Sequence, residues 1–263
     1  MIFALYILVG SISGLFSGLL GIGGGLIVVP SLMIIFSHFN VIPEGMVMHF
    51  CIGTSLTSTI VNLLISTTQH NKTQSVRWDV VKRMLPGVLL GSFILGPILM
   101  LVLNGAYLKI IFGSFCVLLS LYMLYNRSTK GEEKLPTTAA LSVMGFFVAG
   151  ISTLLGIAGG AIIGALFNIW HMNSRQVVGT IAAIGIPIVI PGTIGLIAIG
   201  YIHPINGPAW STGYIYWPAV LGIGLPSLLS VPVGASLTHK ISRPLLRKVF
   251  AYLVLIVGLK MLF

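Results

Sequence analysis

The feature that most constrains this chain is an apolar run at residues 2–36 that is too long to cross a membrane once as a single helix. At about 1.5 Å per residue such a helix would measure about 50 Å, whereas the hydrocarbon core of a bilayer is about 30 Å thick. The run therefore has to break, and Gly21-Ile22-Gly23-Gly24-Gly25 marks the place. Glycines accept positive φ angles and leave N–H groups accessible, so this break predicts an anion-binding turn that needs no buried charge.

The composition indicates that the whole chain is a membrane protein. Its mean hydropathy is +1.07, with 56% hydrophobic and 7% charged residues. Because lipid offers no hydrogen bonds to the backbone, long apolar runs of this kind have to be helices. The net charge of the chain is +10. In membrane proteins such an excess of Lys and Arg usually lies in cytoplasmic loops and orients the chain, so we expect no nucleic-acid partner. The sequence therefore predicts an all-α, multi-pass membrane protein, surrounded by the lipid bilayer.

Eight apolar segments are expected along the chain, and two of them are overlong. With both overlong segments broken, about 8 to 10 helices would cross or enter the membrane. The segments lie at residues 2–36, 46–67, 84–103, 106–125, 137–169, 177–200, 214–237 and 246–262.

The second overlong segment repeats the first. Residues 152–160 align with residues 17–25 at an offset of 135, and Gly179-Thr180 matches Gly53-Thr54 at an offset of 126. The last segment of each half also aligns, at an offset of 138. We therefore expect a tandem duplication, with repeat 1 at residues 1–125, a charged cytoplasmic linker at 126–136 and repeat 2 at 137–263.

The distribution of Lys and Arg favours inverted repeats. If each glycine-broken segment is a hairpin that returns to its starting side, twelve of the 14 basic residues lie on one side of the membrane. If each broken segment crosses the membrane once, seven of these twelve residues lie on one side of the membrane and five on the other. Since basic residues collect in cytoplasmic loops, we expect two inverted repeats, each with one hairpin and three transmembrane helices, and both termini outside.

In such an arrangement the glycine tips of two re-entrant hairpins meet near the middle of the membrane, where transporters bind their substrates. The alternative reading is that these glycines only let helices pack closely. Arg175 follows at the mouth of the second half, as an anion attractor or as a positive-inside anchor. The expected substrate-binding residues are Gly23, Gly24, Gly25, Thr54, Ser55, Gly159, Gly160, Thr180 and Arg175.

The charged and reactive residues exclude several other functions. All four carboxylates lie in loops or at segment ends, which argues against a proton relay or a cation path and favours an anionic or neutral substrate. Cys51 and Cys116 have no ligand spacing, so no metal site is expected, and no cofactor or catalytic residue is assigned. An intramembrane serine hydrolase needs a histidine at the depth of its serine, whereas the histidines here lie near segment ends.

These motifs resemble the TauE/SafE sulfite exporter family. The resemblance rests on residues 14–25, on their weaker copy ending Gly156-Ile157-Ala158-Gly159-Gly160, on the two Gly-Thr pairs and on residues 246–250 and 258–262. It covers essentially the whole chain, although Ala158 stands where the first half has Gly23. The resemblance implies an inner-membrane permease for sulfite, sulfonates such as sulfoacetate, thiosulfate or related small organic anions.

The resulting hypothesis is a secondary transporter that moves a small sulfur-containing anion by alternating access. Two alternatives stay open at this point: a membrane scaffold that transports nothing, and a transporter of another small organic or neutral solute. The sequence is also compatible with a homodimer.

Overall fold

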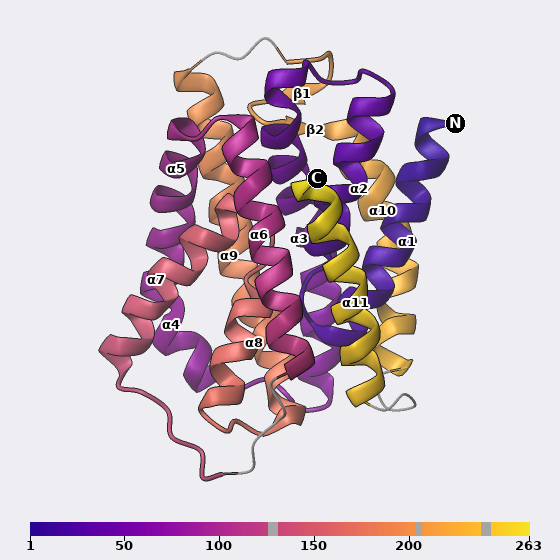
Figure 1. Cartoon of the computed structure of the whole chain (residues 1–263). Coiled ribbons are helices and arrows are strands. Elements are labelled where there is room, and N and C mark those ends of the chain that lie inside the picture. Colours follow the sequence, from indigo (N-terminus) through magenta and orange to yellow (C-terminus); the bar gives the residue numbers. More distant parts are fainter. Residues whose placement is uncertain (126–130, 204–206, 238–242) are drawn as a thin grey trace.

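The computed structural model describes residues 1–125, 131–203, 207–237 and 243–263, with residues 174, 175, 243 and 244 described by their backbone alone. The expected linker therefore lies partly outside the described residues, as does the side chain of Arg175. The described chain is a bundle of helices with one short pair of strands (Figure 1).

The first half of the chain is helical throughout, apart from short connections. Its elements are α1 (Ile2–Leu20), α2 (Gly25–His38), the 3₁₀ turn η1 (Glu44–Met46), α3 (Val47–Lys72), α4 (Trp78–Leu90), the π-helical turn η2 (Gly91–Leu95), α5 (Gly96–Val102) and α6 (Gly105–Tyr125).

The second half follows the same order of helices and adds a small hairpin of strands. Its elements are α7 (Thr138–Leu154), α8 (Gly160–Ile169), α9 (Ser174–Ile202), β1 (Ser211–Thr212), β2 (Ile215–Tyr216), α10 (Trp217–Leu237) and α11 (Arg243–Leu262). The strands are antiparallel, with Ser211 opposite Tyr216.

Both overlong segments break at their glycine runs. Among the described residues, six helical stretches are long and apolar enough to span a membrane. The arms of the two breaks include shorter helices: α2 has 14 residues, α7 has 17 and α8 has 10. In Figure 1, α1 descends from the N-terminus and α2 returns upward, whereas α7 rises from the lower end and α8 returns downward.

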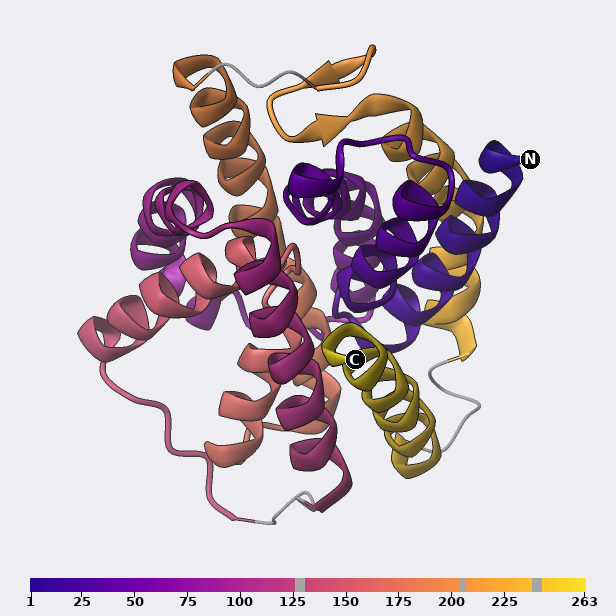
Figure 2. The same cartoon turned by 45° about the horizontal axis from the view of Figure 1, so that its top comes forward.

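The central element is α3, whose apolar window is 78% buried, against 33% for α6 and for α10. It packs against α9, the corresponding helix of the second half, and against α10. On the flanks of the bundle, α1 packs along α10, α7 packs along α4, and α6 packs along α11 (Figure 2). Each of these pairs joins one helix of the first half to one helix of the second.

Most of the described basic residues lie at one end of the bundle, the lower end in Figure 1, which we call the basic end. Only Lys109 and Lys260 among the described lysines and arginines lie on the upper parts of their helices. The described members of the basic end are Lys72, Arg77, Lys82, Arg83, Lys134, Arg247 and Lys248.

Two element boundaries differ from the sequence expectation. Helix α4 begins at Trp78 rather than near residue 84. The prediction placed the start too late because the first turns of α4 carry charged residues, and hydropathy does not distinguish such turns from a loop. The segment expected from residue 214 begins as strand β2, and helix α10 starts only at Trp217. The prediction of a helix at residues 214–216 was therefore wrong.

Helix α9 contains two prolines, Pro187 and Pro191, and the missing N–H group of Pro191 is compensated from another helix. Pro191 cannot donate to the carbonyl of Pro187, four residues earlier. The hydroxyl of Ser92 in η2 lies 3.2 Å from that carbonyl oxygen and 2.8 Å from the carbonyl oxygen of Val88. The π-helical turn and the proline kink therefore share one donor.

The close crossing of α4 and α7 depends on Gly87, whose N–H donates to Ser142 Oγ at 3.1 Å. A Cβ at this position would overlap the backbone carbonyl of Ser142. We expect Gly87→Val to destabilise the protein by about 1 to 3 kcal/mol through overpacking, measured as a lower unfolding temperature in detergent.

The matched control is Gly45→Val, because a Cβ at Gly45 meets nothing within 4 Å. Equal unfolding temperatures for the two variants would contradict this account of the α4–α7 contact.

Candidate functional site

The candidate site is built from two glycine turns, residues 21–24 between α1 and α2 and residues 155–159 between α7 and α8. Gly24 directly precedes α2 with φ of 86°, and Gly159 directly precedes α8 with φ of 75°. Only glycine adopts such angles without strain, so each glycine lets the chain reverse and start a new helix inside the bundle. The two turns thus place two helix N-termini in the interior of the protein.

The two glycine turns are in backbone contact with each other. A Cβ on Gly25 would lie 2.5 Å from the carbonyl oxygen of Gly156, and a Cβ on Gly160 would lie 2.7 Å from Cα of Ile22. Between them, a Cβ on Gly23 would lie 2.8 Å from Cβ of Ala158. Side chains at these positions would force the turns apart, which explains why the runs are glycine-rich.

The turns present hydrogen-bond donors without acceptors. Within the described part of the chain, the N–H groups of Gly23, Gly24, Gly159 and Gly160 donate to no other residue. These groups lie at the positive ends of the dipoles of α2 and α8, where anions bind favourably. All four glycines are buried, so the donors are closed off from water.

Helix α3 supplies polar contacts to both turns. Ser55 Oγ donates to the carbonyl oxygen of Gly156 at 2.9 Å, and Asn62 Nδ2 donates to the carbonyl oxygen of Gly23 at 3.1 Å. Of the nine expected residues, the five glycines and Ser55 are therefore brought together at the turns. The amide of Asn62 joins them, with its Oδ1 buried and without a partner among the described residues.

Two serines next to the turns were not among the expected site residues. Ser17 and Ser152 are fully buried, and neither hydroxyl has a partner in the described residues. Ser152 Oγ lies 3.0 Å from the position of a Cβ on Gly159, close to the N-terminus of α8. Both serines belong to the repeated motif at the same relative position, so the repeat itself contained the information that could have identified them.

The corresponding face of α9 is apolar. At the repeat offset of 126 residues, Ser55 and Asn62 correspond to Ile181 and Ile188. The side chain of Ile181 lies 2.7 Å from a Cβ placed on Gly160, and that of Ile188 lies 2.6 Å from a Cβ placed on Gly159. Polar groups therefore approach the turns from α3, and aliphatic groups approach them from α9.

Thr54 and Thr180 bond to residues outside the turns, and their partners are equivalent. Thr54 Oγ1 accepts the N–H of Tyr216, just before α10, at 3.0 Å. Thr180 Oγ1 accepts the N–H of Arg77, just before α4, also at 3.0 Å, and donates to the carbonyl oxygen of Gln176 at 2.7 Å. Each threonine thus joins a central helix of one half to the start of a helix in the other half.

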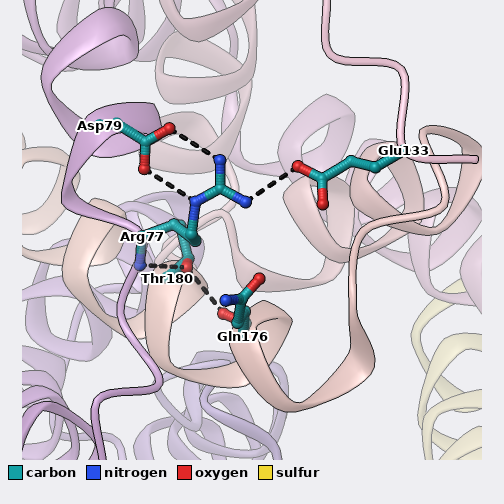
Figure 3. Close-up of polar contacts among 5 residues, drawn as sticks. All are labelled: Arg77, Asp79, Glu133, Gln176 and Thr180. Atoms are coloured by element: carbon teal, nitrogen blue, oxygen red, sulfur yellow. Dashed lines mark hydrogen bonds and ion pairs between the residues drawn. The ribbon is translucent and has the colours of Figure 1, made fainter.

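The contact of Thr180 belongs to an ionic cluster at the basic end (Figure 3). The guanidinium of Arg77 pairs with Asp79 through two bonds of 2.8 Å and with Glu133 at 2.9 Å. The hydrogen bonds to Asp79, more than any other contact, raise the pKa of Arg77. Because these side chains are partly exposed, each pair contributes at most about 1 kcal/mol, and the cluster chiefly fixes where residues 77, 133 and 180 meet.

Several apolar spans packed around two buried helix breaks with unpaired donors define a multi-pass membrane transporter. The chain belongs to the TauE/SafE family, since the family model described as "Sulfite exporter TauE/SafE" matches residues 6–261.

Its relatives are similar over nearly their whole length. A probable membrane transporter protein of Haemophilus influenzae is 33% identical over 98% of this chain and 97% of its own. The probable membrane transporter protein MJ0441 of Methanocaldococcus jannaschii is 29% identical over 100% of this chain and 96% of its own. No solved structure matches the chain. These names indicate a transporter rather than an enzyme.

We expect Thr54→Val and Thr180→Val each to destabilise the protein by about 1 to 2 kcal/mol, because each leaves a backbone N–H without its acceptor. Thermal unfolding measures the loss. Thr54→Ser and Thr180→Ser keep the oxygen and serve as controls that should unfold close to the parent temperature.

The opposite pattern would overturn this assignment. If the valine variants unfolded at the parent temperature but lost the binding of an anion, both hydroxyls would be direct ligands rather than contacts between the halves.

Proposed function

We propose that this transporter carries a small sulfur-containing anion, such as sulfite, sulfoacetate or another sulfonate, or thiosulfate, across the cytoplasmic membrane by alternating access. The observation that carries the proposal is the contact between two buried glycine turns, each with unpaired N–H groups at a helix N-terminus. Membership of a family described as sulfite exporters supports the class of substrate.

The chemistry of the turns suits an oxyanion. A desolvated anion needs several donors to replace its lost hydration, and hydrogen bonds to a charged acceptor are the strong ones. The N–H groups of Gly23, Gly24, Gly159 and Gly160 would supply them from two sides. The hydroxyls of Ser17 and Ser152 would add donors, while Ser55, already bonded to Gly156, would hold the second turn in place.

The packing of the helices supports two inverted repeats, at residues 1–125 and 137–263. Helix α1 packs on α10 as α7 packs on α4, and the pairs α3–α9 and α6–α11 each join equivalent helices. An approximate two-fold axis in the membrane plane would generate this pattern, and it would bring both termini to the same side. The concentration of lysine and arginine at the basic end supports a cytoplasmic location for this end.

The two threonine contacts would act as gates at opposite ends of the site. At the cytoplasmic end, Thr180 and the Arg77 cluster hold α9 against the start of α4. At the outer end, Thr54 holds α3 against the start of α10. In the structure both contacts are formed and the turns are buried, which is an occluded arrangement, and alternating access would open one contact at a time.

The first test is thermal unfolding of the purified protein with sulfite, thiosulfate, sulfoacetate, taurine, sulfate, acetate and chloride. A ligand at about 100 times its dissociation constant should stabilise the folded state by about 2.7 kcal/mol. Stabilisation by a sulfur oxyanion, without an effect of acetate or chloride, is the expected result. No response to any of these anions would favour a scaffold or a carrier of another solute.

Substitutions in the glycine turns test the site itself. Gly24→Val and Gly159→Val should abolish the anion response and transport, because each places a side chain at a positive φ against buried neighbours. Both variants should still insert into the membrane, and Gly45→Val should keep the response. Normal anion flux in both turn variants would remove the turns from the proposed site.

A further inference from the structure

Helix α3 carries a continuous row of polar side chains that extends beyond the glycine turns. The row consists of Ser55, Thr59, Asn62, Ser66 and His70, which we call the α3 stripe. Their spacings of four, three, four and four residues place them on one face of the helix. All five are buried, with exposed fractions between 0% and 9%, and no carboxylate, lysine or arginine lies among them.

The α3 stripe contains polar atoms that lack partners. Three hydroxyls of α3, that of Thr59 in the stripe and those of Thr57 and Thr68 outside it, donate to the carbonyl four residues earlier, as is usual for such residues in helices. Ser66 Oγ makes no such bond and has no other partner in the described residues, and the same holds for Asn62 Oδ1. Buried polar atoms without partners are costly and call for a ligand or water.

The stripe leads from the turns to the basic end. Its upper members contact the turns, through Ser55 to Gly156 and through Asn62 to Gly23. Asn62 and His70 are eight residues apart, about 12 Å along the helix. The backbone carbonyl of His70 accepts the N–H of Ser75 in the connection to α4, next to the exposed Lys72.

The stripe does not continue in the other direction. One turn above Ser55, the residues on the same face are Cys51 and Ile52, followed by Met48, and all three are buried among apolar side chains. The polar face of α3 is therefore one-sided, because it joins the glycine turns to the basic end only.

We propose that the α3 stripe lines the route by which a small anion passes between the glycine turns and the basic end, with Asn62 and Ser66 as the residues that contact it. The inference rests on the proposed transport function and adds residues that the repeat does not suggest. The hydroxyl of Ser66 and the second N–H of the Asn62 amide, whose first N–H donates to Gly23, offer donors to an anion while it is out of contact with the backbone N–H groups of the turns. Asn62 Oδ1, which only accepts hydrogen bonds, would bind water. The lysines and arginines of the basic end attract it to the entrance.

Cysteine accessibility tests this route without knowledge of the substrate. In a background with Cys51→Ala and Cys116→Ala, single cysteines are placed at Asn62, at Ser66 and at Leu64, which lies on the lipid-facing side of α3 at the same depth. Vesicles that expose the basic end are treated with a membrane-impermeant, negatively charged methanethiosulfonate. Asn62→Cys and Ser66→Cys should react at least about tenfold faster than Leu64→Cys, because a thiol in hydrocarbon does not ionise.

The outcomes separate this proposal from the function on which it rests. Reaction at both stripe positions, slowed by an anion that stabilises the parent protein, supports the route. Anion stabilisation of the parent without reaction at either position, or equal reaction at Leu64→Cys, overturns the route and leaves the proposed function standing. A third outcome is reaction at the stripe positions while no tested anion slows that reaction or stabilises the parent protein. This outcome overturns the proposal that the cargo is an anion. Using two stripe positions guards against one variant that does not fold.

Discussion

Inside a bilayer every backbone N–H and C=O group has to find its partner within the protein, yet in the part of the chain that the structure describes the two glycine turns leave buried N–H groups without one. The turns can lie in the interior only because they are glycine-rich and close on each other, Gly25 against Gly156 and Gly160 against Ile22. Each turn therefore depends on the other for its position. The pairing of helices across the two halves follows from this, since α1 and α7 can insert their ends only if α10 and α4 flank them.

The two halves share a backbone plan but differ in chemistry. At equivalent positions α3 presents Ser55 and Asn62 to the turns, whereas α9 presents Ile181 and Ile188. The two halves thus have similar helix breaks, with a polar wall from α3 on one side and an aliphatic wall from α9 on the other. An anion with a polar head and an apolar remainder, such as an organic sulfonate, would match such a site better than an anion that is polar on all sides.

Much of the fold follows from the sequence because the bilayer allows few alternatives. Runs of apolar residues predicted the helices, and the run of 35 residues predicted its own break. The boundaries that failed, at Trp78 and at β2, lie at the surface, where the polar residues of a helix and of a loop look alike.

The site was predictable only in part, because the sequence does not show which polar side chains are already hydrogen-bonded. The glycine turns are visible because nothing else tolerates their geometry. Thr54 and Thr180 also repeat, but the repetition reflects a shared contact with the start of a helix in the other half. A serine or asparagine in a helix usually bonds to its own backbone. The repeat could have pointed to Ser17 and Ser152, but only the coordinates show that these serines and Asn62 have polar atoms without partners among the described residues.

Helices α2 and α8, which lead away from the two glycine turns, differ in length, and this difference affects how a membrane potential acts on a bound ion. Helix α2, with 14 residues, extends about 21 Å from the first turn, whereas α8, with 10 residues, extends only about 15 Å from the second. The turns therefore lie closer to the basic end than to the opposite end. A membrane potential of 100 mV is worth about 2.3 kcal/mol for one charge carried across the whole membrane. For an anionic cargo, the larger share of that voltage would fall on the step between the turns and the end opposite the basic end, and a membrane potential would accelerate or oppose this step most.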